Sequence, residues 1–305
     1  MPLRENRLGR WDLAAFTGND KAAGMIRPRP ALFRALGKDE PPGEIVIDGQ
    51  TYRRVTLFKH DSWAATALYQ SPERSIVCKF NRRQGIAFVP MNWLGRLLAG
   101  REKRVLKLLA GLPSVPGVLG PVVSGGNRLE NAVAHVYIPG HPLRAGEKVN
   151  DDFFPRLRNL LQHMHDRGIA YVDLHKRENI IVGEDGRPYL IDFQISAAWP
   201  APHAPGLGFL CRFLLSILKR CDDYHLAKHI RNCRPDQADE VAWARKQTRP
   251  WWIRLHRLVA VPFRSLRRRL LVTLGIRKRN GRADSEHFPE DAVRQALALE
   301  AGAGK

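Results

Sequence analysis

Two spacings of apolar residues divide the chain into expected strands and helices. In residues 44–80, apolar and polar positions alternate, or β-branched residues cluster, in four short runs: 44–47, 52–59, 65–69 and 75–80. This pattern is typical of strands separated by short turns. Two further runs, at 118–123 and 132–138, end at Pro139-Gly140 and predict two more strands.

Residues 92–110 follow a helical spacing instead, with an apolar stripe formed by Leu94, Leu98, Val105 and Leu109. Glu102 falls on this stripe, and a carboxylate on a core-facing stripe needs a cation to offset its desolvation. Lys79, in the expected strand 75–80, is the candidate cation. The alternatives are a lysine that faces solvent and a glutamate at the edge of the helix.

A second amphipathic helix is expected over residues 150–167. Asn150 is a candidate N-cap, Asp151 and Asp152 suit the positive end of the helix dipole, and Gly168 terminates the pattern. The expected buried face comprises Phe153, Leu157, Leu160, Leu161, Met164 and His165. We interpret His165 as a structural residue.

The segment 165–194 carries the densest candidate chemistry. The apolar runs 180–182 and 189–191 flank a Gly-Glu-Asp-Gly turn, which predicts a β-hairpin. Asp173 and Asn179 precede the first strand and Asp192 follows the second, so the hairpin brings the three side chains together. Their oxygen atoms suit a hard cation such as Mg²⁺ that is bound together with phosphates. The alternative is a surface hairpin with ordinary turn carboxylates.

Helices are expected at 209–219, 222–232 and about 237–246. The second of these carries four potential metal ligands at intervals of four residues: Cys221, His225, His229 and Cys233. A helix rises 1.5 Å per residue, so the outer two lie about 18 Å apart and cannot share one ion. A mixed packing face is therefore favoured over a Zn²⁺ site.

Residues 241–283 contain no Asp or Glu, and all their charged side chains are Arg or Lys, interleaved with Trp and Leu. Pro262 divides this stretch into two expected amphipathic helices. A cationic face opposite a Trp/Leu face suits an anionic membrane surface. The alternatives are ordinary packing on the rest of the protein and, less favoured, binding to nucleic acid.

Composition narrows the number of domains, the kind of partner and the cellular compartment that we expect. The 305 residues allow one large domain or two small ones, and 44% apolar residues suffice for a core. The formal charge of +20 indicates an acidic partner, such as an anionic membrane, nucleic acid or a polyanionic saccharide. Four cysteines without a paired pattern fit a reducing cytosol, and the first residues lack a signal-peptide run. We expect a cytoplasmic protein that binds peripherally to the inner face of the cytoplasmic membrane.

The segment 165–194 resembles the catalytic loop and metal-binding motif of the protein-kinase-like superfamily. It is most similar to the bacterial and atypical branch, which includes lipopolysaccharide-core kinases, RIO-type kinases and aminoglycoside phosphotransferases. Their loops tend to read D-L-H-x-x-N, whereas here Asn179 follows Asp173 by six residues. By this resemblance Asp173 is the catalytic base, Asn179 a metal ligand, and Asp192 the main metal ligand of a DFG-like motif.

The resemblance also assigns the upstream residues. Lys79 and Glu102 match the ion pair between the third strand and the C-helix, in which the lysine holds the α- and β-phosphates of ATP. The loop at 60–65 stands where a glycine-rich phosphate loop is expected, but it contains no glycine. Ser62 is its candidate phosphate-binding residue, because small residues let backbone N–H groups approach phosphates.

Residues 136–140 resemble the hinge of small-molecule and atypical kinases, whose main chain binds adenine. The implied adenine contacts are the backbone groups of Val136 and Ile138, with His135 near the gatekeeper position. The cation that meets the γ-phosphate is His175, Lys176 or Arg177, and Lys176 is taken as the nucleotide-binding residue.

The implied fold is α+β and bilobal. An irregular basic arm (1–44) precedes an N-lobe with a small antiparallel sheet and a C-helix (45–140). A reduced helical C-lobe (141–247) and a basic amphipathic extension (248–305) follow.

The expected function is ATP- and Mg²⁺-dependent transfer of phosphate to a hydroxyl group, on a protein Ser/Thr or on a sugar of a membrane glycolipid. Residues 249–282 are the expected contact with an anionic membrane. The alternative is a catalytically weak pseudokinase that docks on membrane or nucleic acid, which the glycine-free loop and the lengthened catalytic loop favour.

Overall fold

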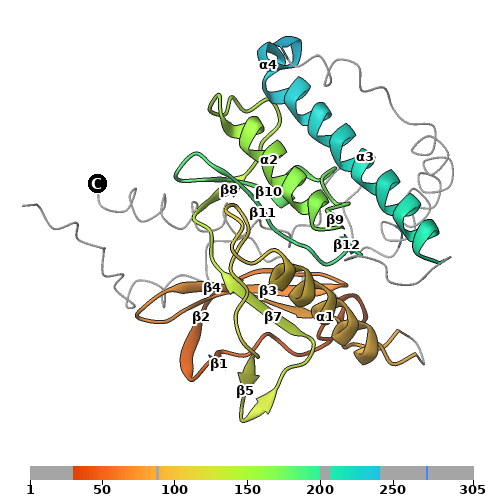
Figure 1. Ribbon diagram of the computed structural model, residues 1–305. Helices are drawn as coiled ribbons and strands as arrows, with labels where there is room; N and C mark the ends of the chain where they lie inside the picture. The colour runs from red at the N-terminus through yellow and green to blue at the C-terminus, as the bar shows by residue number, and fades with distance from the viewer. Residues whose placement is uncertain (1–29, 87–88, 200–206, 241–272, 274–305) are drawn as a thin grey trace, which may run out of the picture.

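The computed structural model describes residues 30–86, 89–199, 207–240 and 273. The fold is α+β and has two parts (Figure 1). A strongly curled antiparallel sheet carries helix α1 (Asn92–Leu108), and a second part combines three helices with short strands within the described residues. This arrangement is compatible with the expected bilobal fold.

The curled sheet has the strand order β6-β5-β1-β2-β3-β4-β7. Its strands are β1 (Glu44–Ile47), β2 (Gln50–His60), β3 (Ala64–Gln70), β4 (Ser75–Asn81), β5 (Val123–Ser124), β6 (Asn127–Arg128) and β7 (Ala132–Val136). The four strands expected within 44–80 are confirmed. The run 118–123 is not one strand, because Gly120-Pro121 interrupts it and proline has no N–H for a ladder.

That interruption lets one segment pair at both edges of the sheet. Val118 forms a bridge with His135 of β7, whereas Val123 of β5 pairs with Val46 of β1. Gly117 O also accepts a hydrogen bond of 2.9 Å from Val136 N. The sheet therefore curls until its two edges are joined through residues 117–124.

Alternation along β3 and β4 separates the two faces of this sheet. One face fills the interior of the curl with a buried cluster that includes Ile45, Tyr52, Ala65, Ala67, Tyr69, Ile76, Cys78 and Phe80. Lys79 lies on the opposite face, toward α1. Because side chains alternate between faces in a strand, the same apolar pattern that builds the core directs Lys79 out of it.

Helix α1 contacts β4 and β7 and confirms the helix expected at 92–110. Its buried residues are Gly95, Ala99, Glu102, Val105 and Leu106, so the expected stripe is correct only in part. A Cβ at Gly95 would lie 2.2 Å from the carbonyl oxygen of Arg82. The small residues at 95 and 99 thus allow the helix to approach the sheet closely, whereas Leu94 and Leu98 of the expected stripe are only half-buried.

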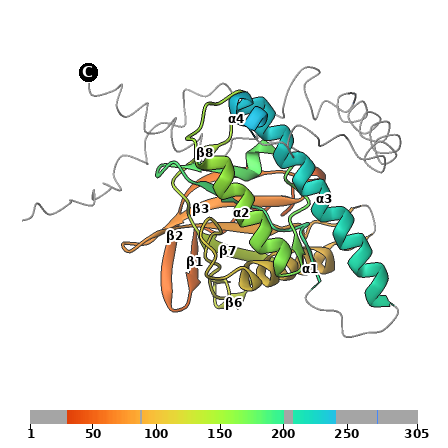
Figure 2. The ribbon, with the colours of Figure 1, turned by 45° about the horizontal axis from the view of Figure 1, so that its top comes forward.

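The second part contains α2 (Phe153–Asp166), α3 (Leu207–Cys233) and α4 (Pro235–Glu240), and α2 and α3 lie side by side in two views (Figures 1 and 2). Its short strands are β8 (Gly140–Pro142), β9 (Ile169–Ala170), β10 (Ile180–Gly183), β11 (Pro188–Leu190) and β12 (Ala197–Ala198). The strands form the sheets β11-β10-β8 and β12-β9. The expected hairpin is confirmed, with Ile180 opposite Leu190.

The buried face predicted for the helix at 150–167 is also confirmed, because all six residues are buried in α2. The helix begins later than expected, however, and Asp152 rather than Asn150 occupies the N-cap position without a side-chain cap. The core of this part joins α2, the hairpin, α3 and the C-terminal end of α1 in one cluster.

Two separate helices at 209–219 and 222–232 were expected, and this prediction is wrong. The helix α3 is continuous because no glycine or proline interrupts it after Gly208. Asp222, the first residue of the second expected helix, is fully buried in the middle of α3. The third expected helix corresponds to α4, which begins at Pro235, a favoured first position for proline.

The first 29 residues of the expected arm and the basic extension, apart from Thr273, lie outside the described residues. The described part of the arm includes a short 3-10 helix, η2 (Ala31–Phe33), and packs against the sheet, where Ala35 and Leu36 are buried. No helix within the described ranges is long and apolar enough to span a membrane.

Candidate active site

The hairpin brings Asp173, Asn179 and Asp192 to one place, as predicted. Asn179 ends a short 3-10 helix, η3 (Arg177–Asn179), directly before β10, and Asp192 follows β11 closely. Ile191 N donates a hydrogen bond of 3.1 Å to Asn179 O and closes the open end of the hairpin. Asn179 Nδ2 then donates to Asp173 Oδ2 over 2.8 Å.

Lys79 joins the two parts of the fold at this site. Its Nζ lies 2.6 Å from Asp192 Oδ1 and 3.2 Å from Glu102 Oε2. The expected Lys79–Glu102 ion pair is therefore present, and only 2% of the Glu102 side chain is exposed. Burial alone would lower the pKa of Lys79, but the adjacent Asp192 and Glu102 carboxylates reverse this effect and raise it.

The two carboxylates beside Lys79 differ in their electrostatics. Burial raises the pKa of Glu102, against the opposing charge of Lys79. Burial would also raise the pKa of Asp192, but Lys79, followed by Lys176 and Lys59, lowers it to about 2. Asp192 is therefore a stable anion at neutral pH. Its Oδ2 accepts no hydrogen bond from the described residues.

Asp173 is 2% exposed and has distinct environments at its two oxygens. Oδ2 is engaged by Asn179 and by Lys176 Nζ, at 2.7 Å. Oδ1 is buried without a hydrogen-bond partner, although His175 Nδ1 lies 3.2 Å away in poor hydrogen-bond geometry. A buried carboxylate oxygen of this kind can accept a proton from a hydroxyl group that enters the site.

The backbone before Asp173 is strained and is held from α3. Val172 has φ of 71°, an outlier for a β-branched residue, and Asp192 has φ of 61°. Asp222 accepts hydrogen bonds from Tyr171 N at 2.7 Å and from Val172 N at 2.8 Å. His165 Nε2 also lies 3.2 Å from this carboxylate, which confirms a structural role for His165.

Histidines of α3 provide a second support for the loop. His229 Nε2 donates to Leu174 O over 2.7 Å, and the rings of His225 and His175 lie 5.8 Å apart. Burial lowers the pKa of His225 and of His229 to about 4, so both are neutral at pH 7. No group of three or more His, Cys, Asp or Glu side chains in the described ranges is arranged to hold a metal ion.

The sequence did not predict Asp222 or His229 as supports of the loop. An acidic residue next to Asp223 resembles an exposed helix start, and the histidine spacing on its own suggests packing. Only the contacts of α3 with residues 171–174, about 50 positions earlier, reveal their roles.

The expected phosphate loop is closed by its own side chains. Ser62 Oγ donates to Phe33 O over 3.1 Å, so this hydroxyl contacts the N-terminal segment instead of the residues around Lys79. Trp63 N and Ala64 N both donate to Asp61 Oδ1, at 2.6 and 2.9 Å. The phosphate-binding role of Ser62 stays a prediction: Ser62 Oγ, Trp63 N and Ala64 N already have partners, whereas none of the hydrogen bonds of the described residues involves the Ser62 N–H.

The two residues assigned to the expected hinge, Val136 and Ile138, differ in whether their backbone groups already form hydrogen bonds. Val136 N donates to Gly117 O, and Val136 O lies 2.9 Å from His135 Nδ1, so the sheet closure occupies Val136. The backbone N–H and C=O of Ile138, by contrast, form no hydrogen bond within the described residues. Ile138 is the better candidate for a main-chain contact with a base.

No family model matches this sequence, and no curated protein matches it either. The site is thus defined by its own geometry: a buried lysine held by two carboxylates from different elements, beside a hydrogen-bonded Asp173–Asn179 pair.

Proposed function

We propose that this protein is an ATP- and Mg²⁺-dependent phosphotransferase of protein-kinase-like fold that acts on a hydroxyl group. The observation that carries the proposal is the position of Lys79. It forms ion pairs with Glu102 of α1 and with Asp192 at the end of the hairpin. Structural ion pairs seldom bury a lysine between two carboxylates, because desolvation opposes it. Phosphate binding gives such a lysine a function.

The described side chains fit nucleotide and metal. Asp192 Oδ2 and Asn179 Oδ1 accept no hydrogen bond from the described residues, and they are the hard oxygen ligands that Mg²⁺ takes together with phosphates. A metal ion held there would neutralise charge on the transferred phosphoryl group. Lys79 and Lys176 supply fixed positive charge for the phosphates.

Asp173 is assigned as the base. As the acceptor oxygen forms its bond to the γ-phosphorus, the bond from that phosphorus to the bridging oxygen breaks and ADP leaves. The hydroxyl proton passes to Asp173, whose Oδ1 is buried without a hydrogen-bond partner. Asp222 and His229 are positioning residues, because they hold the backbone on either side of Asp173.

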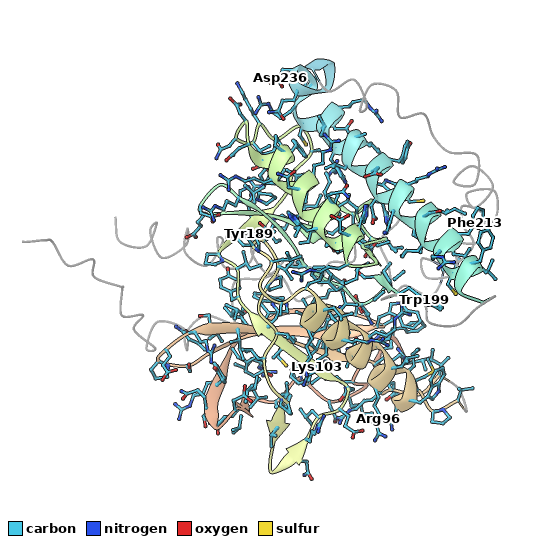
Figure 3. All side chains as sticks on the ribbon, viewed as in Figure 1. Arg96, Lys103, Tyr189, Trp199, Phe213 and Asp236 are labelled. Atoms are coloured by element: carbon cyan, nitrogen blue, oxygen red, sulfur yellow. The ribbon has the colours of Figure 1, made fainter. Side chains whose placement is uncertain are left out.

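The acceptor is a protein Ser/Thr hydroxyl or a sugar hydroxyl of a membrane glycolipid, and the basic composition of residues 249–282 supports the second. An exposed apolar surface supports the proposal that the protein acts at the cytoplasmic face of an anionic membrane. Phe213 near the N-terminal end of α3 is 54% exposed and Trp199 is 47% exposed (Figure 3). Phe209, Leu210 and Leu214 are exposed on the same helix.

One observation favours the alternative of a pseudokinase that docks on membrane. Two backbone donors of the turn after β2, Trp63 N and Ala64 N, are bonded to Asp61, which removes these two groups from a backbone cradle for phosphates. ATP turnover separates the two functions.

The test compares ATP hydrolysis and phosphate transfer by the wild-type protein with Asp173→Ala and Asp192→Ala. We expect both variants to lose at least about 100-fold in rate, the lower range for removal of a general base. Asp185→Ala, in the exposed turn of the same hairpin, is the matched control and should retain activity. Equal background rates for wild type and both site variants would refute the enzyme. Mass spectrometry of products from envelope and cytosolic fractions then identifies the acceptor.

A further inference from the structure

The turn between β2 and β3 lacks what a phosphate loop usually provides. It has no glycine, and Asp61 accepts the N–H groups of Trp63 and Ala64. A nucleotide bound beside Lys79 would meet no free backbone donor from these two residues. The phosphates of such a nucleotide therefore need a different partner on this side of the site.

The register of the sheet places a second lysine in line with Lys79. Lys59 of β2 lies opposite Thr66 of β3, and Thr66 lies opposite Lys79 of β4. Directly opposed residues of antiparallel strands direct their side chains to the same face. Lys59, Thr66 and Lys79 thus form one row across three strands, with about 10 Å between the Cα atoms of the two lysines.

Lys59 is held within reach of the candidate site. Its Nζ lies 2.7 Å from Asp61 Oδ2, and 41% of its side chain is exposed. Burial would raise the pKa of Asp61, but the charge of Lys59 and its hydrogen bond outweigh this and lower it. Lys59 is also among the cations whose charge lowers the pKa of Asp192. The same lysine therefore acts electrostatically on the turn and on the candidate metal ligand.

We infer that Lys59 is a nucleotide-phosphate-binding residue that takes the place of a glycine-rich backbone loop. Asp61 closes the turn and orients Lys59 while the site is free. When a nucleotide binds, the ammonium group of Lys59 contacts one of its phosphate groups. Lys59 and Lys79 then hold the phosphate chain from neighbouring points of one sheet face. The inference rests on the proposed function, because it names the residue that binds the polyphosphate part of the same substrate.

A purely structural role for Lys59 makes a different prediction. An ion pair as exposed as this one stabilises a protein by about 0–1 kcal/mol. If Lys59 only fastened the turn, its removal would lower stability slightly and leave nucleotide affinity unchanged. Nucleotide affinity is therefore the measurement that separates the two roles.

The experiment uses the full chain with Lys59→Gln, and with Arg53→Gln as the matched control. Arg53 lies on the same strand, is 74% exposed and forms a weaker pair with Glu44, at 3.6 Å. Calorimetry measures the Kd for ATP with Mg²⁺ and for adenosine, and steady-state assays measure KM and kcat. For Lys59→Gln we expect the Kd and KM for ATP to rise about 10- to 100-fold, as for loss of a charged hydrogen bond.

Other readings should remain close to those of the wild type. Adenosine affinity should not change, because the lost contact is to phosphate, and kcat should change less than KM. Lys59→Arg should retain part of the ATP affinity, and the control variant Arg53→Gln should retain all of it. ATP affinity of Lys59→Gln equal to that of the wild type overturns this inference alone. A wild-type protein that binds no ATP overturns the proposed function as well.

Discussion

Replacing Asp222 with Asn tests how the loop before Asp173 is held. The carboxylate is fully buried. Its Oδ2 accepts hydrogen bonds from Tyr171 N and His165 Nε2, and its Oδ1 accepts one from Val172 N. Asparagine has the same shape but only one acceptor oxygen. Its amide group must face at least one N–H donor, which leaves that donor buried without a partner.

The expected loss in stability follows from these contacts. A hydrogen bond to a charged group contributes about 1.5–3 kcal/mol, and an unsatisfied buried donor costs about 1–3 kcal/mol. Val172 also releases backbone strain of about 1–3 kcal/mol if the loop relaxes, which offsets part of the loss. We therefore expect Asp222→Asn to lower the free energy of unfolding by about 2–4 kcal/mol, a large share of ordinary domain stability.

Urea denaturation, followed by tryptophan fluorescence and circular dichroism, measures this difference. Asp223→Asn is the matched control. Burial raises the pKa of Asp223, so its charge does not stabilise the fold and its removal should change the free energy of unfolding little. Activity provides the second readout. The kcat should fall because Asp173 is displaced, whereas the KM for ATP should change little. If the free energies of unfolding of Asp222→Asn and of the control differ by less than about 1 kcal/mol, Asp222 does not hold the loop.

Three further outcomes are expected. His229 has its pKa lowered to about 4 by burial, so between pH 6.5 and 4 the unfolded chain binds a proton that the folded chain does not. This histidine alone should lower the free energy of unfolding by up to about 3 kcal/mol across the window. His225, whose pKa burial also lowers to about 4, contributes in the same direction, so His229→Gln should reduce the slope measured by denaturation at several pH values without abolishing it. Gly95→Ala should destabilise by about 1–3 kcal/mol, because its Cβ would lie 2.2 Å from Arg82 O, whereas Gly100→Ala on the same helix meets no atom within 4 Å and should be neutral or stabilising in thermal melts. The full chain should sediment with anionic but not with neutral liposomes, and failure to do so would remove the membrane contact proposed for residues 249–282.

Local pattern predicted the elements whose stability depends on local pattern. The strands of residues 44–80 and the hairpin followed from alternation and turn residues, because one face of each must be buried. The Lys79–Glu102 pair followed from the requirement that a carboxylate on a buried helix face has a cation. The strands and the hairpin needed only the residues within one element and one physical rule, whereas the choice of Lys79 as the partner of Glu102 also used the resemblance to the kinase ion pair.

Contacts between distant elements could not be predicted in this way. The N–H of Val136 is occupied because the sheet closes through Gly117, and nothing near Val136 in the sequence indicates this. The row of Lys59 and Lys79 depends on the register shift between Leu57 and Lys59 in β2. Without that irregularity, alternation gives no reason to distinguish Lys59 from the other basic residues of the strand.

If the proposed function holds, the cations of the site would couple nucleotide binding to the proposed base, Asp173. Lys176 Nζ lies 2.7 Å from Asp173 Oδ2, and Lys59 Nζ lies 2.7 Å from Asp61 Oδ2. Both lysines are about 41% exposed, so both can turn toward a phosphate without unpacking a core. A polyphosphate that attracts Lys176 would leave Asn179 as the remaining donor to Asp173 Oδ2. The carboxylate would then be more available to an acceptor hydroxyl when nucleotide is bound, and less available when it is not.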